Sequence, residues 1–199
     1  MKTPHSRFPV PAIDALPEDL RERIDAVSEK SGFVPNVFRV LAHRPDEFRA
    51  FFAYHDALME KDSALTKGER EMIVVATSAI NKCLYCVVAH GAVARIRERD
   101  PKLADQLATD YTRADITARQ VAMLDFACLV AERAAEIDED DFEDLREHGF
   151  DDEAIWDIGA IAAFFAMSNR LASLTDMRPN DEFYAMGREP RRPGPRLVK

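Results

Sequence analysis

A chain of 199 residues is long enough to bury a substantial core as one domain or two small ones. Its 27 Lys and Arg against 36 Asp and Glu give a net charge of −9, which argues against a nucleic acid as partner. Prolines interrupt the start where the apolar part of a secretory signal would lie, and no uncharged apolar run approaches the ~18 residues that span a membrane. We therefore expect a cytoplasmic protein with no membrane partner.

Helix-terminating residues and the spacing of apolar residues predict helices along the whole body of the chain. Only 7 Gly occur, and runs that alternate apolar and polar residues between turns are missing, which weighs against sheets. We expect an extended arm over 1–16, a single all-helical domain over 17–186 and a disordered basic tail over 187–199. Helices are expected at 17–31, 37–43, 46–61, 67–80, 83–99, from 101 onward, and at 118–136, 142–148 and 153–175.

Two of these helices begin with a capping box. In this motif the side chain of the residue that precedes the helix accepts the backbone N–H of the third helical residue, whose side chain accepts the backbone N–H of the preceding residue in return. The boxes are Thr66 with Glu69 and Thr117 with Gln120. The segments around the two boxes are weakly alike, so an internal helical repeat is one interpretation. The predicted fold class is all-α, a helical bundle.

Residues that carry chemistry concentrate in one stretch, where Glu71 precedes a CxxC pair, Cys83 and Cys86, and His90 follows. If a new helix begins at Cys83, spacings of three and four place both thiols and the imidazole on one face. A Cys at a helix start meets unpaired N–H groups and the positive end of the helix dipole, which lower its pKa and favour the thiolate. An odd total of three Cys does not fit a structural disulfide framework.

Two interpretations of the cluster involve no catalysis. In the first, Cys83, Cys86 and His90 are packed residues on a buried helix face, since Cys is often buried. In the second, they bind zinc, which commonly takes four ligands in a structural site. The motif supplies three, so Glu71 or Cys128 would have to be the fourth, and the sequence holds no second CxxC pair.

Two further interpretations involve redox chemistry. Attachment of a c-type haem needs His directly after the second Cys, and Val87 occupies that position, so this interpretation fails. Thiol redox catalysis remains, because a CxxC pair can close a disulfide within one turn and a nearby base can generate the attacking thiolate. The sequence supplies a candidate for each of these roles, and we take this interpretation as the leading one.

In this stretch, eleven residues separate Glu71 from Cys83, and the motif C-x-x-C-x-x-x-H then runs from Cys83 to His90. This pattern resembles that of the alkylhydroperoxidase D family of the carboxymuconolactone decarboxylase-like superfamily. The Pro-rich arm and the segments ITARQ, FEDLREHGF and SNRLA are similar to its peroxidase-related branch, and the resemblance covers roughly residues 10–185. It implies an alkylhydroperoxidase D-like helical fold and thiol-dependent reduction of hydroperoxides. It further implies no bound cofactor or metal, an external thiol reductant such as a lipoyl- or thioredoxin-type protein, and a homo-oligomer of two or more subunits.

In that family the thiol matching Cys86 is oxidised to sulfenic acid, and the one matching Cys83 is its more exposed partner, which closes the disulfide. The positions of Glu71 and His90 carry the proton relay. Tyr85 stands where alkylhydroperoxidase D has a second relay histidine, and a phenol with pKa near ~10 shuttles protons poorly at neutral pH. From the residues alone, the helix start favours Cys83 as the thiolate and the spacing to His90 favours Cys86. We follow the spacing argument.

Two other functions stay open beside the peroxidase. One is a ring-modifying enzyme like carboxymuconolactone decarboxylase, which does not need the CxxC pair, and the other is a redox sensor or interaction protein whose dithiol does not turn over. Outside the cluster, Cys128 and His55 are expected in the core. Asn169 and Arg170 are polar residues near the end of an apolar helix; they could face the thiols, but we favour a helix-terminal structural role.

Overall fold

The computed structural model describes residues 5–189, and over these residues the chain forms helices and no strand, which confirms the all-α prediction. Residues 190–199, most of the predicted basic tail, lie outside the described part. The helices are α1 (Glu18–Ser31), α2 (Asn36–Leu41), α3 (Pro45–Met59), α4 (Lys67–Ile80), α5 (Leu84–Glu98), α6 (Leu103–Asp110), α7 (Ala118–Arg133), α8 (Glu139–Glu147), α9 (Asp152–Thr175) and α10 (Asp181–Ala185), with short 3-10 turns at Ile13–Ala15, Tyr111–Arg113 and Ala134–Glu136.

Most helix ends lie close to the predicted positions, but α8 begins at Glu139 rather than at 142, because Asp138 forms a capping box that was not predicted, and α7 ends at Arg133 rather than at 136. Both predicted capping boxes form, at the starts of α4 and α7. Gly32 ends α1 with φ of 83°, a left-handed conformation that costs glycine little. Helix α10 was not predicted, because five residues are too few to show a helical period. The arm expected to be extended contains the turn Ile13–Ala15.

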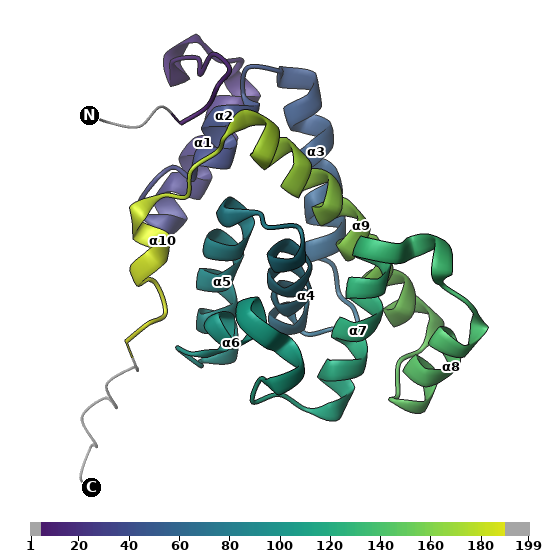
Figure 1. Ribbon diagram of the computed structural model, residues 1–199. Coiled ribbons are helices and arrows are strands. Elements are labelled where there is room, and N and C mark those ends of the chain that lie inside the picture. Colours follow the sequence, from purple (N-terminus) through teal and green to yellow (C-terminus); the bar gives the residue numbers. More distant parts are fainter. Residues whose placement is uncertain (1–4, 190–199) are drawn as a thin grey trace, which may run out of the picture.

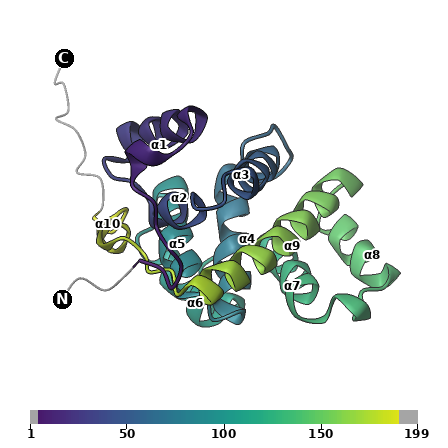
Figure 2. The same cartoon turned by 90° about the horizontal axis from the view of Figure 1, so that it is seen from above.

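Helix α4 lies at the centre of the bundle and packs against α5, α6, α7 and α9 (Figure 1). Four consecutive residues of α4, Met72 to Val75, are fully buried, so the helix is covered on every side. A second layer of α1, α2 and α3 lies beside this bundle (Figure 2), and its core contains a cluster of three aromatic rings, in which Phe38 stacks on Phe52 and Phe48 packs against both. The two weakly similar segments around the capping boxes begin α4 and α7, which are both long helices of the main core.

Helix α9, the longest at 24 residues, runs across the bundle and packs against α3, α4 and α7. By length and composition alone it could cross a membrane, but half of its apolar window is buried inside the protein. No other helix of residues 5–189 meets the same criteria. Its apolar composition is therefore explained by its place as a core helix.

Candidate active site

A tight turn between α4 and α5 builds the site, as the interruption in the helical pattern predicted. Asn81 ends α4, Lys82 adopts a left-handed conformation with φ of 54°, and Cys83 is the residue that precedes the first turn of α5. The backbone N–H of Cys83 donates to the carbonyl of Ser78 at 2.9 Å. The turn lays α5 alongside α4, so residues far apart in the motif face each other.

Glu71 of α4 and His90 of α5 meet across this hairpin. The His90 Nδ1 atom lies 2.7 Å from Glu71 Oε2, and the side chains are only 18% and 13% exposed. The carboxylate accepts a hydrogen bond from the Nδ1–H group, so Nε2 is the ring nitrogen that can take up a proton. The edge of the Phe165 ring packs on the imidazole with centroids 4.7 Å apart. The geometry is that of an oriented general base.

Cys83 and Cys86 are both buried, each 2% exposed and each a free thiol. The neighbouring Cys86 thiol, together with the Cys86 backbone N–H and the Asn169 side chain, lowers the pKa of Cys83 to about 7. The Cys83 sulfur and burial hold the pKa of Cys86 well above the usual value of a thiol. Cys83 is therefore the acidic member of the pair.

One expectation about the pair needs correction, and the order of attack stays a prediction. Cys83 is not the more exposed thiol in this chain, since both are buried to the same extent. The first attack was assigned to Cys86 because of its spacing to His90, yet no hydrogen bond joins these two side chains within the described residues. Cys86 Sγ instead lies 4.0 Å from Ser168 Oγ of α9. The acidities favour Cys83 as the first thiolate, as its position at the helix start suggested.

Helix α9 supplies a residue that sequence reasoning assigned to a structural role. Asn169 is 1% exposed and hydrogen-bonds to Ser78 at 2.9 Å and to Asn81 at 3.0 Å, beside the turn that carries Cys83. The only sequence signal was a polar side chain in an apolar helix. Arg170, next to it, is exposed and donates to the carbonyl of Ala166, in keeping with the structural role expected for it.

Tyr85 has a different partner from the one a relay would need. Its hydroxyl accepts the backbone N–H of Val37 at 3.1 Å, and burial raises its pKa. The residue therefore ties α5 to the start of α2. His55 is half-buried beside Phe165 with its Nδ1 atom 3.1 Å from Asp56 Oδ1, and burial lowers its pKa.

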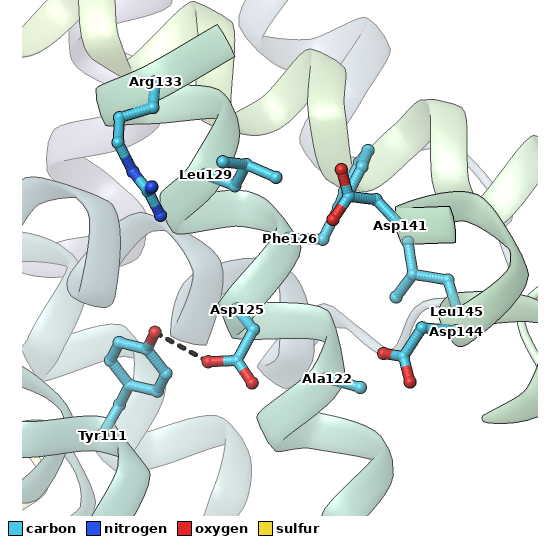
Figure 3. A pocket seen from close by; sticks show the side chains of 9 residues that line it. All are labelled: Tyr111, Ala122, Asp125, Phe126, Leu129, Arg133, Asp141, Asp144 and Leu145. Atoms are coloured by element: carbon cyan, nitrogen blue, oxygen red, sulfur yellow. Dashed lines mark hydrogen bonds between the residues drawn. The ribbon is translucent and has the colours of Figure 1, made fainter. Parts of the chain in front are cut away.

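The third cysteine lies apart from the dithiol. Cys128 of α7 is buried in the main core, and burial raises its pKa to about 12, so it is an inert thiol at neutral pH. A cavity of about 310 Å³ opens between α7 and α8 nearby, where Tyr111 Oη donates to Asp125 at 2.8 Å (Figure 3). In residues 5–189, no group of three or more His, Cys, Asp or Glu side chains is arranged to hold a metal ion.

Comparisons with known proteins agree with this geometry. Residues 45–110 match the family model described as the carboxymuconolactone decarboxylase family. An uncharacterized peroxidase-related protein from Ralstonia eutropha JMP134, described as an alkylhydroperoxidase AhpD core, is 67% identical over 95% of this chain and 100% of that chain, with a TM-score of 0.94. A peroxidase-related protein from Silicibacter sp. TM1040 is 44% identical over 94% and 97%, with a TM-score of 0.89.

The debrominase Bmp8 shares the fold alone, at 21% identity over 89% of this chain and 93% of that chain and a TM-score of 0.73. A search of the curated proteins found no significant match. Fold and site define an all-helical protein with a dithiol beside a carboxylate–imidazole pair. The chain belongs to the AhpD-like, peroxidase-related proteins of the carboxymuconolactone decarboxylase superfamily.

Proposed function

We propose that the chain is a thiol peroxidase that reduces hydroperoxides with the Cys83–Cys86 dithiol. The observation that supports this most directly is the Glu71–His90 pair, held at 2.7 Å on the same helix hairpin that presents an acidic thiol at the start of α5. Membership of the peroxidase-related proteins supports the same reaction class. No bound cofactor is needed, because the two sulfurs carry both electrons.

The reaction divides into two steps on the protein. A thiolate of the pair attacks the hydroperoxide ROOH, an S–O bond forms as the O–O bond breaks, and the alkoxide leaves as ROH after taking a proton from the relay. The remaining thiol loses its proton, its sulfur attacks the sulfenic sulfur, and the hydroxide leaves as water. The hydroperoxide is reduced by two electrons and the dithiol becomes a disulfide. His90, oriented by Glu71, accepts and returns the protons at Nε2.

An external dithiol returns the two electrons and two protons by thiol–disulfide exchange. We propose a reductant of the lipoyl- or thioredoxin-type class. Turnover with such a reductant separates an enzyme from a redox sensor, because a sensor is oxidised once by peroxide and then stops. The test is therefore peroxide consumption by the reduced protein, first in a single turnover and then with each class of dithiol supplied in excess.

Mild oxidation should produce an intramolecular Cys83–Cys86 disulfide and leave Cys128 as a free thiol. The pair lies within one helical turn, whereas Cys128 is buried in the main core with a raised pKa. Mass mapping after oxidation by a substoichiometric hydroperoxide measures this, and Cys128→Ser serves as the matched control that should behave like the parent. A bridge that contains Cys128, or thiols that survive excess peroxide, would contradict the proposed function.

We propose further that the protein is a symmetric homo-oligomer that uses the outer face of α9 and α3. Trp156 is 70% exposed, Leu174 58% and Tyr54 49%, and a groove of about 810 Å³ lined mainly by apolar side chains lies between the two helices. Exposed apolar surface of this extent is typical of an interface.

Light scattering at micromolar concentration should give the mass of a dimer or a larger assembly. Trp156→Glu combined with Leu174→Glu should reduce that mass, because charges at the centre of an apolar contact are costly to bury. The matched control is Glu182→Gln, a change of an exposed side chain on α10, a helix that packs against α5. A parent protein that is monomeric under these conditions would contradict the proposal.

A further inference from the structure

The dithiol is closed off by two segments that lie outside the main core. Both cysteines are 2% exposed and belong to a separate buried apolar cluster. Apart from residues of α5 and Ala172 of α9, the members of this cluster come from segments far apart in the sequence, Phe33, Val37 and Val40 from 33–41 and Met177, Phe183 and Met186 from 176–186. We call these two segments, which contain α2 and α10, the cover of the dithiol.

The two halves of the cover are bound to each other. The backbone N–H of Asn36 donates to Asn180 Oδ1 at 2.8 Å, and Asn180 Nδ2 donates to the carbonyl of Val34 at 3.0 Å. The rings of Phe33 and Phe183 pack edge to face with centroids 5.0 Å apart. The two segments therefore form one layer.

Side chains of α5 hold this layer in place. The hydroxyl of Tyr85, which stands between the two cysteines in the sequence, accepts the backbone N–H of Val37 at 3.1 Å. Further along α5, the buried Arg95 donates to the carbonyls of Phe183 and Met186, each at 2.9 Å. Within residues 5–189, no backbone–backbone hydrogen bond joins the cover to α5. A layer attached in this way can open locally at a lower free energy than the main core.

Reduction of the disulfide requires access to a sulfur atom. A thiolate of the reductant attacks one sulfur, a mixed disulfide forms, and the other sulfur leaves as a thiolate. The second thiol of the reductant then closes its own disulfide and releases the first sulfur, so that two electrons and two protons reach the dithiol. Cysteines that are 2% exposed beneath the cover do not admit a lipoyl arm or a protein surface.

We propose that the cover moves away from α5 to admit the thiol reductant, and that Tyr85 is a positioning residue that holds it closed. The hydrogen bond from Val37 to Tyr85 joins α2 to the segment between the two cysteines, so it closes the cover at the dithiol itself. The part that this opening plays in reduction rests on the proposed function. The opening itself does not depend on that function.

Tyr85→Phe tests the proposal on the intact chain, because it removes the hydrogen bond to Val37 and keeps the ring. In the reduced protein, alkylation of Cys83 and Cys86 by iodoacetamide should become about fivefold faster, the factor expected when one net hydrogen bond no longer opposes opening. Cys128 is the internal reporter: it lies in the main core, so its rate should not change. Mass spectrometry resolves the three sites in one sample.

The matched control is Tyr184→Phe, the same substitution at a tyrosine of α10 that is 46% exposed, and its three rates should equal those of the parent. The oxidised protein gives a second measurement that needs no hydroperoxide turnover. Reduction of the disulfide by dithiothreitol, a small dithiol probe, should be faster in Tyr85→Phe by a similar factor. Arg95→Met, which removes the two hydrogen bonds to residues 183 and 186, should also speed both reactions.

Unchanged alkylation of the dithiol in Tyr85→Phe would overturn the proposal. A proportional increase at all three cysteines would overturn it as well, because global unfolding exposes Cys128 together with the dithiol. Slower oxidation by hydroperoxide with unchanged alkylation would assign Tyr85 to the proton relay instead. A protein that shows the faster alkylation and reduction but consumes no hydroperoxide would contradict the peroxidase function and support the opening of the cover.

Discussion

Glu71→Gln should slow the oxidation of the dithiol by hydroperoxide by ~10²–10⁴-fold near neutral pH, and His90→Gln should slow it to a similar extent. The structure places the Glu71 carboxylate 2.7 Å from His90 Nδ1, so the carboxylate fixes the orientation and tautomer of the ring and leaves Nε2 free to accept a proton. An amide in its place can accept the same hydrogen bond but carries no charge. The imidazole then becomes a weaker base, and proton transfer to and from the reacting oxygen and sulfur atoms is slowed.

The pH–rate profile distinguishes this explanation from a structural effect. At high pH the thiols ionise without a base, so much of the lost rate should return in both variants. Stopped-flow measurement of thiol loss across the pH range is the experiment, and Glu136→Gln, an exposed glutamate paired with Arg133, is the control with unchanged kinetics. A Glu71→Gln profile that superimposes on that of the parent would end the relay hypothesis.

The parts of the fold that could be predicted from the sequence are those set by local chemistry. The capping boxes at Thr66 and Thr117 and the turn before Cys83 each involve a few adjacent residues, so the ends of α4, α5 and α7 were foreseen. The resemblance to alkylhydroperoxidase D implied a relay of Glu71 and His90, and their contact follows because a chain that turns once between two helices has few other ways to pack them. The contact depends on one short-range event, the break after Ile80.

The rest of the site depends on contacts between residues that are distant in the chain. Asn169 reaches Asn81 and Ser78 across 88 and 91 positions, and no spacing rule in a single sequence predicts such a pair. Spacing alone leaves the order of attack within the dithiol undecided for a related reason. The three-and-four spacing placed Cys86 and His90 on one face, but it did not show that Cys86 would pack against Ser168 of α9.

The last expected result concerns which thiol reacts first, and it compares Cys83→Ser with Cys86→Ser. In Cys86→Ser the serine hydroxyl can still donate to the Cys83 thiolate, and the backbone N–H at the start of α5 is retained. Cys83 should therefore stay reactive toward iodoacetamide near neutral pH, within a few-fold of the parent. In Cys83→Ser the effect of the Cys83 sulfur on Cys86 is lost, but burial of the remaining thiol still raises its pKa.

Alkylation of Cys83→Ser at neutral pH should accordingly be slower by on the order of a hundredfold, because each pH unit of raised pKa removes about nine tenths of the thiolate. The sign of the pH effect follows from the same values: reactivity of the parent should fall as the pH drops below about 7, where Cys83 takes up its proton. Neither variant should turn over with a dithiol reductant, since each lacks one sulfur of the pair. The measurements are alkylation rates in a Cys128→Ser background and trapping of the sulfenic acid formed by one addition of hydroperoxide. Sulfenic acid formed readily in Cys83→Ser and not in Cys86→Ser would restore Cys86 as the attacking thiol and overturn the order proposed from the acidities.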